Sequence, residues 1–245
     1  MITDAKRTRS QPDPQGGART LVRQPINRPF PLVLIAQGNS HDVADQVVLC
    51  EYLASQGFVV AATPSPMLRS PMEREEQVGT FAETQAAELT AAIAAVAAVV
   101  PVDTQHLAVA GHSFGARAAL LLAMQDRRVR AIVSLDGGIG TATAAESFRR
   151  VPSFRADTPL PPLLHFYEEL DAFMAPDFAM LKSLRTSELV LEPTEAMHHV
   201  HFTTYGFAAA LFPDLARATR ATPATGTAVT RVAERTASFL ERSLR

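Results

Sequence analysis

The sequence predicts an α/β fold in which a mostly parallel central sheet is covered by helices on both faces. The first observation is that short apolar runs alternate with longer helical segments along the chain. The second is that these runs are continuously apolar, as strands buried on both faces of a sheet are. The third is the length of 245 residues, 47% of them hydrophobic, which suits one large domain with its own core.

The first half of the chain contains three predicted strands and two predicted helices. Gly57 follows the first helix, where a glycine is typical of a helix end. Pro101 ends the second helix, because proline cannot continue the helical hydrogen-bond pattern. In chain order, the elements are strand 31–36, helix 43–56, strand 58–62, helix 74–99 and strand 107–110.

The second half continues this alternation, which indicates a parallel sheet. The segment from Gly137 to Pro162 is predicted to be irregular and too short for a cap domain, so we expect an open or thinly covered site. The predicted elements are helix 115–125, strands 129–135 and 163–167, helix 176–184, strand 188–192, and helices 204–211 and 227–243.

The composition divides the chain into two parts. Residues 1–28 are rich in Gln, Pro, Gly and Arg, so we expect a flexible N-terminal segment. Residues 29–245 carry the alternating pattern and form a single predicted domain. We find no internal repeat within them.

The charge and the apolar runs exclude several classes of partner. The net charge of −2 argues against nucleic acid. The longest apolar run, residues 91–100, is too short for a membrane span. Residues 1–30 contain no secretory apolar region, so we expect a cytoplasmic protein, although a secreted form with its leader removed would show the same sequence. The single Cys50 forms no internal disulfide, and the sequence does not define the oligomeric state.

The stretch HLAVAGHSFGAR, residues 106–117, contains a G-x-S-x-G motif between a predicted strand and a predicted helix. Such a turn is tight and strained, and the strand and the helix approach each other closely there. Only glycine, which has no side chain, is therefore expected to fit at positions 111 and 115, where the sequence has Gly111 and Gly115. The turn presents the Ser113 hydroxyl above the carboxyl edge of the sheet. It also directs the backbone N–H of Phe114 to where a negatively charged oxygen would develop. The motif predicts that Ser113 is a nucleophile.

A serine nucleophile needs a histidine base, and three histidines follow late in the chain: His198, His199 and His201. We expect one of them to reach Ser113. A His-His-x-His metal site is the competing interpretation. His112, at the variable position of the motif, is expected to point away from the chemistry.

The base in turn needs a carboxylate, and two strand ends offer one. Asp136 follows strand 129–135 and precedes Gly137 and Gly138. The next strand ends in a rival set, consisting of Glu168, Glu169 and Asp171. The residues alone leave both alternatives open.

With these motifs the chain resembles the α/β-hydrolases, and within them the bacterial relatives of platelet-activating-factor acetylhydrolase and dienelactone hydrolase. The resemblance covers roughly residues 29–205. The segments that carry it are PLVLIAQGNS, GHSFGA, SLDGG and HHVHFTT.

The resemblance implies site residues one by one. The position that matches the acid of the acetylhydrolase-like group is Asp136. The base of that group precedes a phenylalanine by three residues, which matches His199 before Phe202. The implied oxyanion donors are the backbone N–H groups of Phe114 and Asn39.

Two features depart from this pattern. Gln37 stands where the oxyanion loop of the family usually has histidine, which puts the support of that loop in doubt. The segment ELDAF is similar to polyester-cleaving cutinases, in which Asp171 would be the acid.

The sequence therefore predicts a serine hydrolase that cleaves carboxylic esters through an acyl-enzyme, without metal or organic cofactor. The thin cover of the site indicates esters with short acyl groups, or a bulky, polymeric ester that lies across an open cleft. Acyl transfer by the same residues and a cutinase-like polyester hydrolase are the alternatives. A non-catalytic binding protein is a third class, which the presence of all three partners of the triad disfavours.

Overall fold

The computed structural model describes residues 2–4, 8–11, 20–23, 29–65, 77–149 and 151–244. The predicted flexibility of residues 1–28 falls largely outside these ranges and stays a prediction, as does the domain boundary at residue 29. Three short strands lie within that segment: β1 (Ile2–Asp4), β2 (Thr8–Gln11) and β3 (Thr20–Arg23). β2 pairs with β3, and β1 pairs with the central sheet, both antiparallel.

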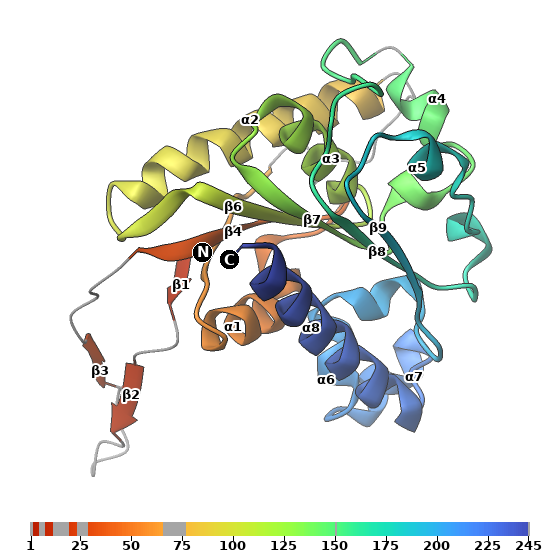
Figure 1. Cartoon of the computed structure of the whole chain (residues 1–245). Coiled ribbons are helices and arrows are strands. Elements are labelled where there is room, and N and C mark those ends of the chain that lie inside the picture. The colour runs from red at the N-terminus through yellow and green to blue at the C-terminus, as the bar shows by residue number, and fades with distance from the viewer. Residues whose placement is uncertain are drawn as a thin grey trace.

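The central sheet has seven strands in the order β1-β5-β4-β6-β7-β8-β9 (Figure 1). All neighbours except β1 and β5 run parallel. The sheet therefore confirms the predicted mostly parallel α/β architecture. The other strands are β4 (Phe30–Ala36), β5 (Val59–Ala62), β6 (Val102–His112), β7 (Val129–Leu135), β8 (Leu163–Tyr167) and β9 (Leu189–Pro193).

Helices cover both faces of this sheet (Figure 1). α2 and α3 lie on one face, and α1 and α8 lie on the other. The helices are α1 (Val47–Ser55), α2 (Gln77–Ala97), α3 (Gly115–Gln125), α4 (Ala144–Phe148), α5 (Ala179–Ser183), α6 (Thr204–Ala209), α7 (Pro213–Thr219) and α8 (Pro223–Ser243). Short 3₁₀ turns are η1 (Val43–Gln46), η3 (Gly138–Gly140), η4 (Ala172–Met174) and η5 (His199–Phe202).

The two faces of the sheet contribute to two separate apolar cores. In β4, Leu32 and Leu34 pack with α2 and α3, whereas Val33 and Ile35 pack with α1 and α8. All four side chains are almost completely buried. Because both faces are covered, this strand is apolar at successive positions rather than at alternate ones.

Most of the predicted elements lie where the sequence pattern places them, and the bounds of α3, β7 and β8 agree to the residue. Gly57 has a φ of 94°, as expected of a glycine that ends a helix. β6 begins at Val102 rather than at 107, and α8 begins at Pro223 rather than at 227. The proline in the first turn of α8 is compatible with helix because its missing N–H has no intrahelical acceptor there.

The sequence pattern misses two helices. α4 lies inside the segment predicted to be irregular, and it has only five residues. α7 contains no buried residue, so it shows no apolar periodicity that could reveal it. The helix predicted for 204–211 ends at Ala209, and the exposed Leu211 and Phe212 connect α6 to α7.

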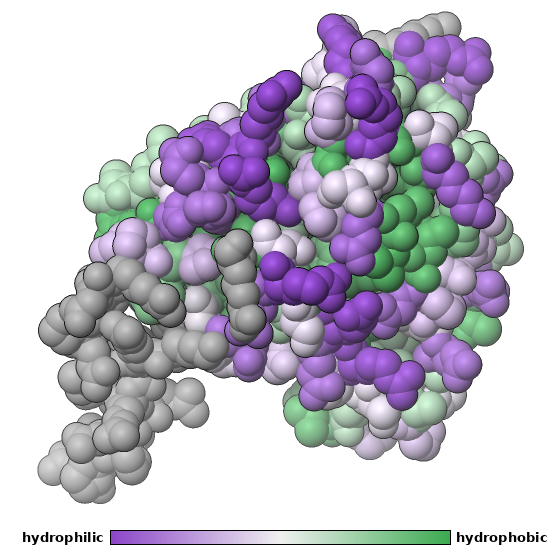
Figure 2. Space-filling model, viewed as in Figure 1, coloured by the Kyte–Doolittle hydropathy of each residue, from purple (hydrophilic) through white to green (hydrophobic). Residues whose placement is uncertain are grey.

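The surface carries polar and apolar areas side by side. Figure 2 shows hydrophilic residues over much of one face and an apolar area near β8 and β9. β9 is the last strand of the sheet, and its Leu189, Val190 and Leu191 are only half-buried. None of the helices in the described part of the chain is both long enough and apolar enough to span a bilayer.

Candidate active site

Ser113 occupies the turn between β6 and α3. β6 ends at His112 and α3 begins at Gly115, which leaves two residues to reverse the chain direction. Ser113 has a φ of 53°, a conformation that costs a non-glycine residue free energy. Its backbone N–H donates to the carbonyl oxygen of Leu135 at 3.1 Å, which ties the turn to the neighbouring strand.

The two glycines of the motif are required by close contacts of the backbone. A Cβ atom on Gly111 would lie 2.4 Å from the carbonyl carbon and oxygen of Gly115. A Cβ atom on Gly115 would lie 2.2 Å from the carbonyl oxygen of Ala36. These neighbours are main-chain atoms of a strand and a helix and cannot move aside. The glycine requirement predicted from the motif is confirmed.

The side chains of Ser113, His199 and Asp136 lie in one hydrogen-bonded line. The His199 Nε2 atom is 2.9 Å from the Ser113 hydroxyl, and the His199 Nδ1 atom is 2.6 Å from Asp136 Oδ2. Ser113 follows β6, Asp136 follows β7 and His199 begins η5. Three distant segments therefore meet at the carboxyl edge of the sheet. Burial raises the pKa of Asp136, and the hydrogen bond from His199 opposes that shift.

The turn that holds Asp136 packs against the serine turn. Asp136 has a φ of 45°, and its N–H donates to the carbonyl of Phe166 at 2.9 Å. The N–H of Gly138 donates to the carbonyl of Ser113 at 3.0 Å. A Cβ atom on Gly137 would lie 2.2 Å from the side chains of both Ala116 and Ser134. The glycines after Asp136 therefore permit close contact between the two turns.

Asp171, the rival carboxylate, makes different contacts. Its Oδ2 accepts the backbone N–H of His199 at 2.9 Å. Its Oδ1 accepts from His198 Nδ1 at 3.0 Å and from Arg220 Nη2 at 2.6 Å. Burial opposes the ionisation of Asp171, but the hydrogen bonds from His199, Arg220 and His198 outweigh it and lower its pKa. The structure thus brings Asp136, and not Asp171, to the His199 ring.

The other histidines of the region do not contact the Ser113 hydroxyl. The backbone N–H of His198 donates to Nδ1 of the buried His201 at 2.9 Å, and burial lowers the pKa of His201 to about 4. The expectation that His112 points away from the site is wrong. Its ring centroid lies 4.8 Å from that of His199, and its Nε2 atom is 3.3 Å from the His199 carbonyl oxygen.

The loop after β4 reaches the serine turn as well. A Cβ atom on Gly38 would lie 3.0 Å from the Cβ atom of Ser113. Among the described residues, the backbone N–H groups of Asn39 and Phe114 have no protein acceptor. Both N–H groups can therefore donate a hydrogen bond to an oxygen atom of a ligand.

Gln37, at the position where the resemblance implies a histidine, connects this loop to the segment after β5. With its amide oriented to satisfy both neighbours, it donates to the Thr63 carbonyl at 2.7 Å and accepts from the Ser65 N–H at 3.1 Å. The side chain of Gln85, fully buried on α2, donates to the Gln37 carbonyl at 3.0 Å. The sequence pattern identifies neither contact as part of the site, because Gln85 is 48 residues from Gln37.

One group of side chains offers metal-ligand chemistry among the described residues. Ligand atoms of Glu168, Asp171 and His198 lie within 4.8 Å of one another. Arg220 already pairs with Asp171, which leaves less negative charge for a cation. Among the described residues, no such group contains all three late histidines, His198, His199 and His201. The structure therefore does not support the alternative of a His-His-x-His metal site.

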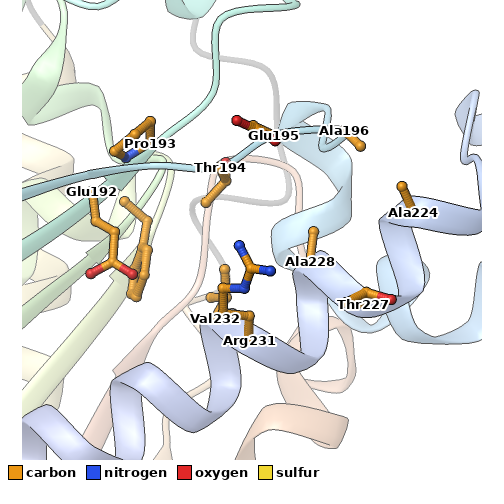
Figure 3. A pocket seen from close by; sticks show the side chains of 11 residues that line it. Glu192, Pro193, Thr194, Glu195, Ala196, Ala224, Thr227, Ala228, Arg231 and Val232 are labelled. Carbon is orange, nitrogen blue, oxygen red and sulfur yellow. The ribbon is translucent and has the colours of Figure 1, made fainter.

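A cavity of about 510 Å³ lies apart from these residues (Figure 3). It is lined by α8 and by the segment that runs from β9 toward Met197. Figure 3 shows Arg231 beside Val232 and below Thr194. Ser113, Asp136 and His199 do not line this cavity.

Comparisons with known proteins agree with the geometry. The chain is similar to a solved ferulic acid esterase from Streptomyces cinnamoneus, with 22% identity and a TM-score of 0.71, over 91% of this chain and 69% of that chain. This likeness confirms the α/β-hydrolase fold. No curated protein matches the chain.

The family comparison goes further than the fold. Residues 4–158 match the family model described as Chlorophyllase. The prediction of a carboxylic ester hydrolase is confirmed, whereas the narrower resemblance to platelet-activating-factor acetylhydrolase stays a prediction. Because the match spans more than half of the sequence, the chain belongs to the Chlorophyllase family.

Proposed function

We propose that the protein cleaves carboxylic esters through a serine acyl-enzyme, with Ser113 as nucleophile, His199 as base and Asp136 as the acid that orients the base. The observation that carries this proposal is the hydrogen-bonded line from Asp136 through His199 to Ser113. A serine hydroxyl is weakly nucleophilic by itself, and a neutral imidazole within hydrogen-bond distance can accept its proton.

In the first half of the reaction, Ser113 Oγ attacks the ester carbonyl while its proton moves to His199 Nε2. The Nδ1–H of His199 donates to Asp136, which fixes the tautomer and stabilises the charged imidazolium. The backbone N–H groups of Phe114 and Asn39 stabilise the oxyanion, and each contributes about a hundredfold or more in rate. His199 then protonates the leaving alcohol, and an acyl-enzyme remains.

In the second half, His199 takes a proton from water as the water oxygen attacks the acyl carbonyl. The tetrahedral intermediate collapses, Ser113 recovers its proton and the carboxylic acid leaves. An alcohol in place of water would give acyl transfer from the same acyl-enzyme. The ratio of acid to new ester, measured with a competing alcohol, distinguishes the two reactions.

The rim of the site favours esters with an apolar part. The Phe173 ring is 71% exposed and lies edge-on to the His199 ring, with 5.2 Å between centroids. Leu170, in the same connection, is also more than half exposed. Exposed apolar side chains beside a reactive group are typical of a surface that binds apolar ligand. One similar structure is by its printed name an esterase of ferulic acid, an aromatic acid, and we propose a substrate with an apolar or aromatic part.

The test uses p-nitrophenyl esters of increasing acyl length together with a fluorophosphonate probe. We expect the wild type to hydrolyse the esters and to be labelled at Ser113. Ser113→Ala is expected to lose both activities while it folds normally, whereas Ser238→Ala, which changes an exposed serine of α8, retains them. Hydrolysis and labelling by Ser113→Ala at the wild-type rate would show that the proposed mechanism is wrong.

A further inference from the structure

The turn that follows β8, residues 168–171, contacts both the acid and the base of the proposed triad. The backbone N–H of Glu168 donates to Asp136 Oδ1 at 3.3 Å. Three residues later, Asp171 Oδ2 accepts the backbone N–H of His199 at 2.9 Å. One short segment therefore contacts the two residues whose side chains must meet at 2.6 Å.

The turn is held in shape by its own buried carboxylate. The Glu168 side chain is fully buried, and it accepts the backbone N–H of Asp171 at 3.0 and 3.2 Å and that of Leu170. These hydrogen bonds fix the residues between the two contacts. The distance between Asp136 and the His199 main chain thus depends on this turn.

Asp171 is also anchored by Arg220. The guanidinium of Arg220 lies 2.6 Å from Asp171 Oδ1, although the Arg220 side chain is otherwise 63% exposed. Arg220 follows α7 and has a φ of 61°. His198 donates to the same oxygen at 3.0 Å. Both oxygens of Asp171 are therefore engaged, and neither contacts the ring of His199.

We infer that Asp171 is a positioning residue that holds the His199 main chain in place, so that the imidazole reaches Ser113 and Asp136 together. This inference rests on the proposed function of His199. Reacting groups must be held to within about 0.5 Å, and a displacement of about 1 Å can lower a rate by about a hundredfold. A carboxylate that binds the backbone N–H of the base fixes its position without taking part in proton transfer.

The kinetic test compares Asp171→Ala and Asp171→Asn with Asp136→Asn. We expect Asp171→Ala to lower kcat by about 10- to 100-fold while KM changes less than about threefold. Asp171→Asn keeps an oxygen acceptor for the His199 N–H, so its kcat should lie within about fivefold of the wild type. Asp136→Asn should lose about 10⁴-fold, because it favours the wrong tautomer of His199.

Two further variants separate the anchor from general effects of charge. Arg220→Ala removes the anchor of Asp171 and should lower kcat about twofold to fivefold. Asp214→Ala is the matched control, because Asp214 is an almost fully exposed carboxylate of α7 whose ion pair is with Arg217. It should leave kcat and KM unchanged.

A spectroscopic measurement distinguishes positioning from a general loss of structure. The His199 Nδ1–H proton, which bonds to Asp136, should give a downfield NMR signal in the wild type. We expect this signal to vanish in Asp136→Asn, to broaden in Asp171→Ala and to return in Asp171→Asn.

Two results would overturn the inference. A loss in Asp171→Asn as large as that in Asp136→Asn would make Asp171 the acid itself. Wild-type kcat in Asp171→Ala, or in Arg220→Ala if Asp171→Ala does not fold, would show that the anchor is unnecessary. Ser113→Ala separates these failures from failure of the proposed function, since only the latter leaves Ser113→Ala active.

Discussion

The serine turn and the histidine loop meet at one hydroxyl but are built by different means. The serine turn is shaped by glycines within two residues of Ser113, whose missing side chains let a strand and a helix approach. His199 is held by Asp136, Asp171 and Ser113, which lie 63, 28 and 86 residues away. The first region is determined by close main-chain packing, and the second by polar contacts between distant segments.

This difference predicts two kinds of response to substitution. A side chain added where main-chain atoms are in close contact must displace the backbone. Changes in the serine turn should therefore affect folding and activity together. Polar contacts can be weakened one at a time, so changes around the histidine should be graded. The variants below test this distinction.

The largest effect is expected from the histidine itself. His199→Ala removes the proposed base and should lower kcat by about 10⁴-fold or more. His198→Ala is the matched control, because it removes a neighbouring imidazole that contacts Asp171 and not Ser113. It should cost less than about tenfold, since Arg220 still engages Asp171. Ester hydrolysis by both purified variants measures the ratio, and equal losses would contradict the placement of His199 as the base.

The next effect concerns the serine turn. Gly115→Ala places a Cβ atom 2.2 Å from the Ala36 carbonyl oxygen and should destabilise the fold by about 3 kcal/mol or more. Gly226→Ala in α8 is the control, because its Cβ atom would meet only the Ala210 Cβ at 3.6 Å. That change should stabilise the protein by about 0.5–1 kcal/mol. Urea unfolding compares the two, and a fully stable, active Gly115→Ala would show that the turn tolerates a side chain.

A third effect concerns a histidine of β8 that lies beside Ser134, two residues before Asp136. His165 is buried, with its Nδ1 atom 2.8 Å from the Ser134 hydroxyl, and burial lowers its pKa to about 3. Below pH 6.5 the unfolded chain gains a proton on this residue, whereas the folded protein does not until about pH 3. Its contribution to stability is therefore complete above pH 6.5 and decreases as the pH falls toward 3, by about 2 kcal/mol at pH 5.

His165→Phe should remove this part of the pH dependence, even if the variant is less stable at pH 7.5. The measurement is the free energy of unfolding at pH 7.5 and at pH 5.0 for both proteins. A pH dependence unchanged by the substitution would show that His165 takes up its proton equally in both states.

A smaller effect is expected from the support of the loop after β4, which carries the proposed oxyanion donor Asn39. Gln85→Leu removes the donor to the Gln37 carbonyl and should lower kcat about tenfold, because the Asn39 N–H is then less firmly placed. Thr84→Ala changes the half-buried neighbour of Gln85 on α2, whose hydroxyl donates to the Thr80 carbonyl of the same helix, and should have no effect on kcat. Pre-steady-state acylation rates test this, and equal rates in the two variants would show that the loop needs no support from α2.

The two regions also explain how much the sequence alone could predict. The serine turn and the strands around it follow from local rules, since glycine spacing and continuous apolar runs determine their geometry. The residues alone could not decide whether Asp136 or Asp171 is the acid, because both follow a strand at the same edge of the sheet. The resemblance favoured Asp136, and the structure brings it to the His199 ring.

The supports of the site could not be predicted at all. Arg220 lies 49 residues from Asp171, and Gln85 lies 48 residues from Gln37. An arginine after a surface helix and a glutamine on an amphipathic helix are common in proteins, so neither residue type indicates a role at the site. Only the fold brings them beside the histidine loop and the oxyanion loop.

The smallest expected effect concerns the substrate and extends the comparison to the rim of the site. Phe173 and Asp171 belong to one connection, in which the buried carboxylate contacts the His199 main chain and the exposed ring lies edge-on to the His199 ring. If the ring binds the apolar part of an ester, Phe173→Ala should lower kcat/KM about fivefold for long acyl chains and leave acetate esters unchanged. Val99→Ala removes another exposed apolar side chain, which follows the C-terminal end of α2, and should change neither. An equal loss of kcat/KM at all acyl chain lengths would instead indicate that Phe173 acts by positioning His199 and does not bind the substrate.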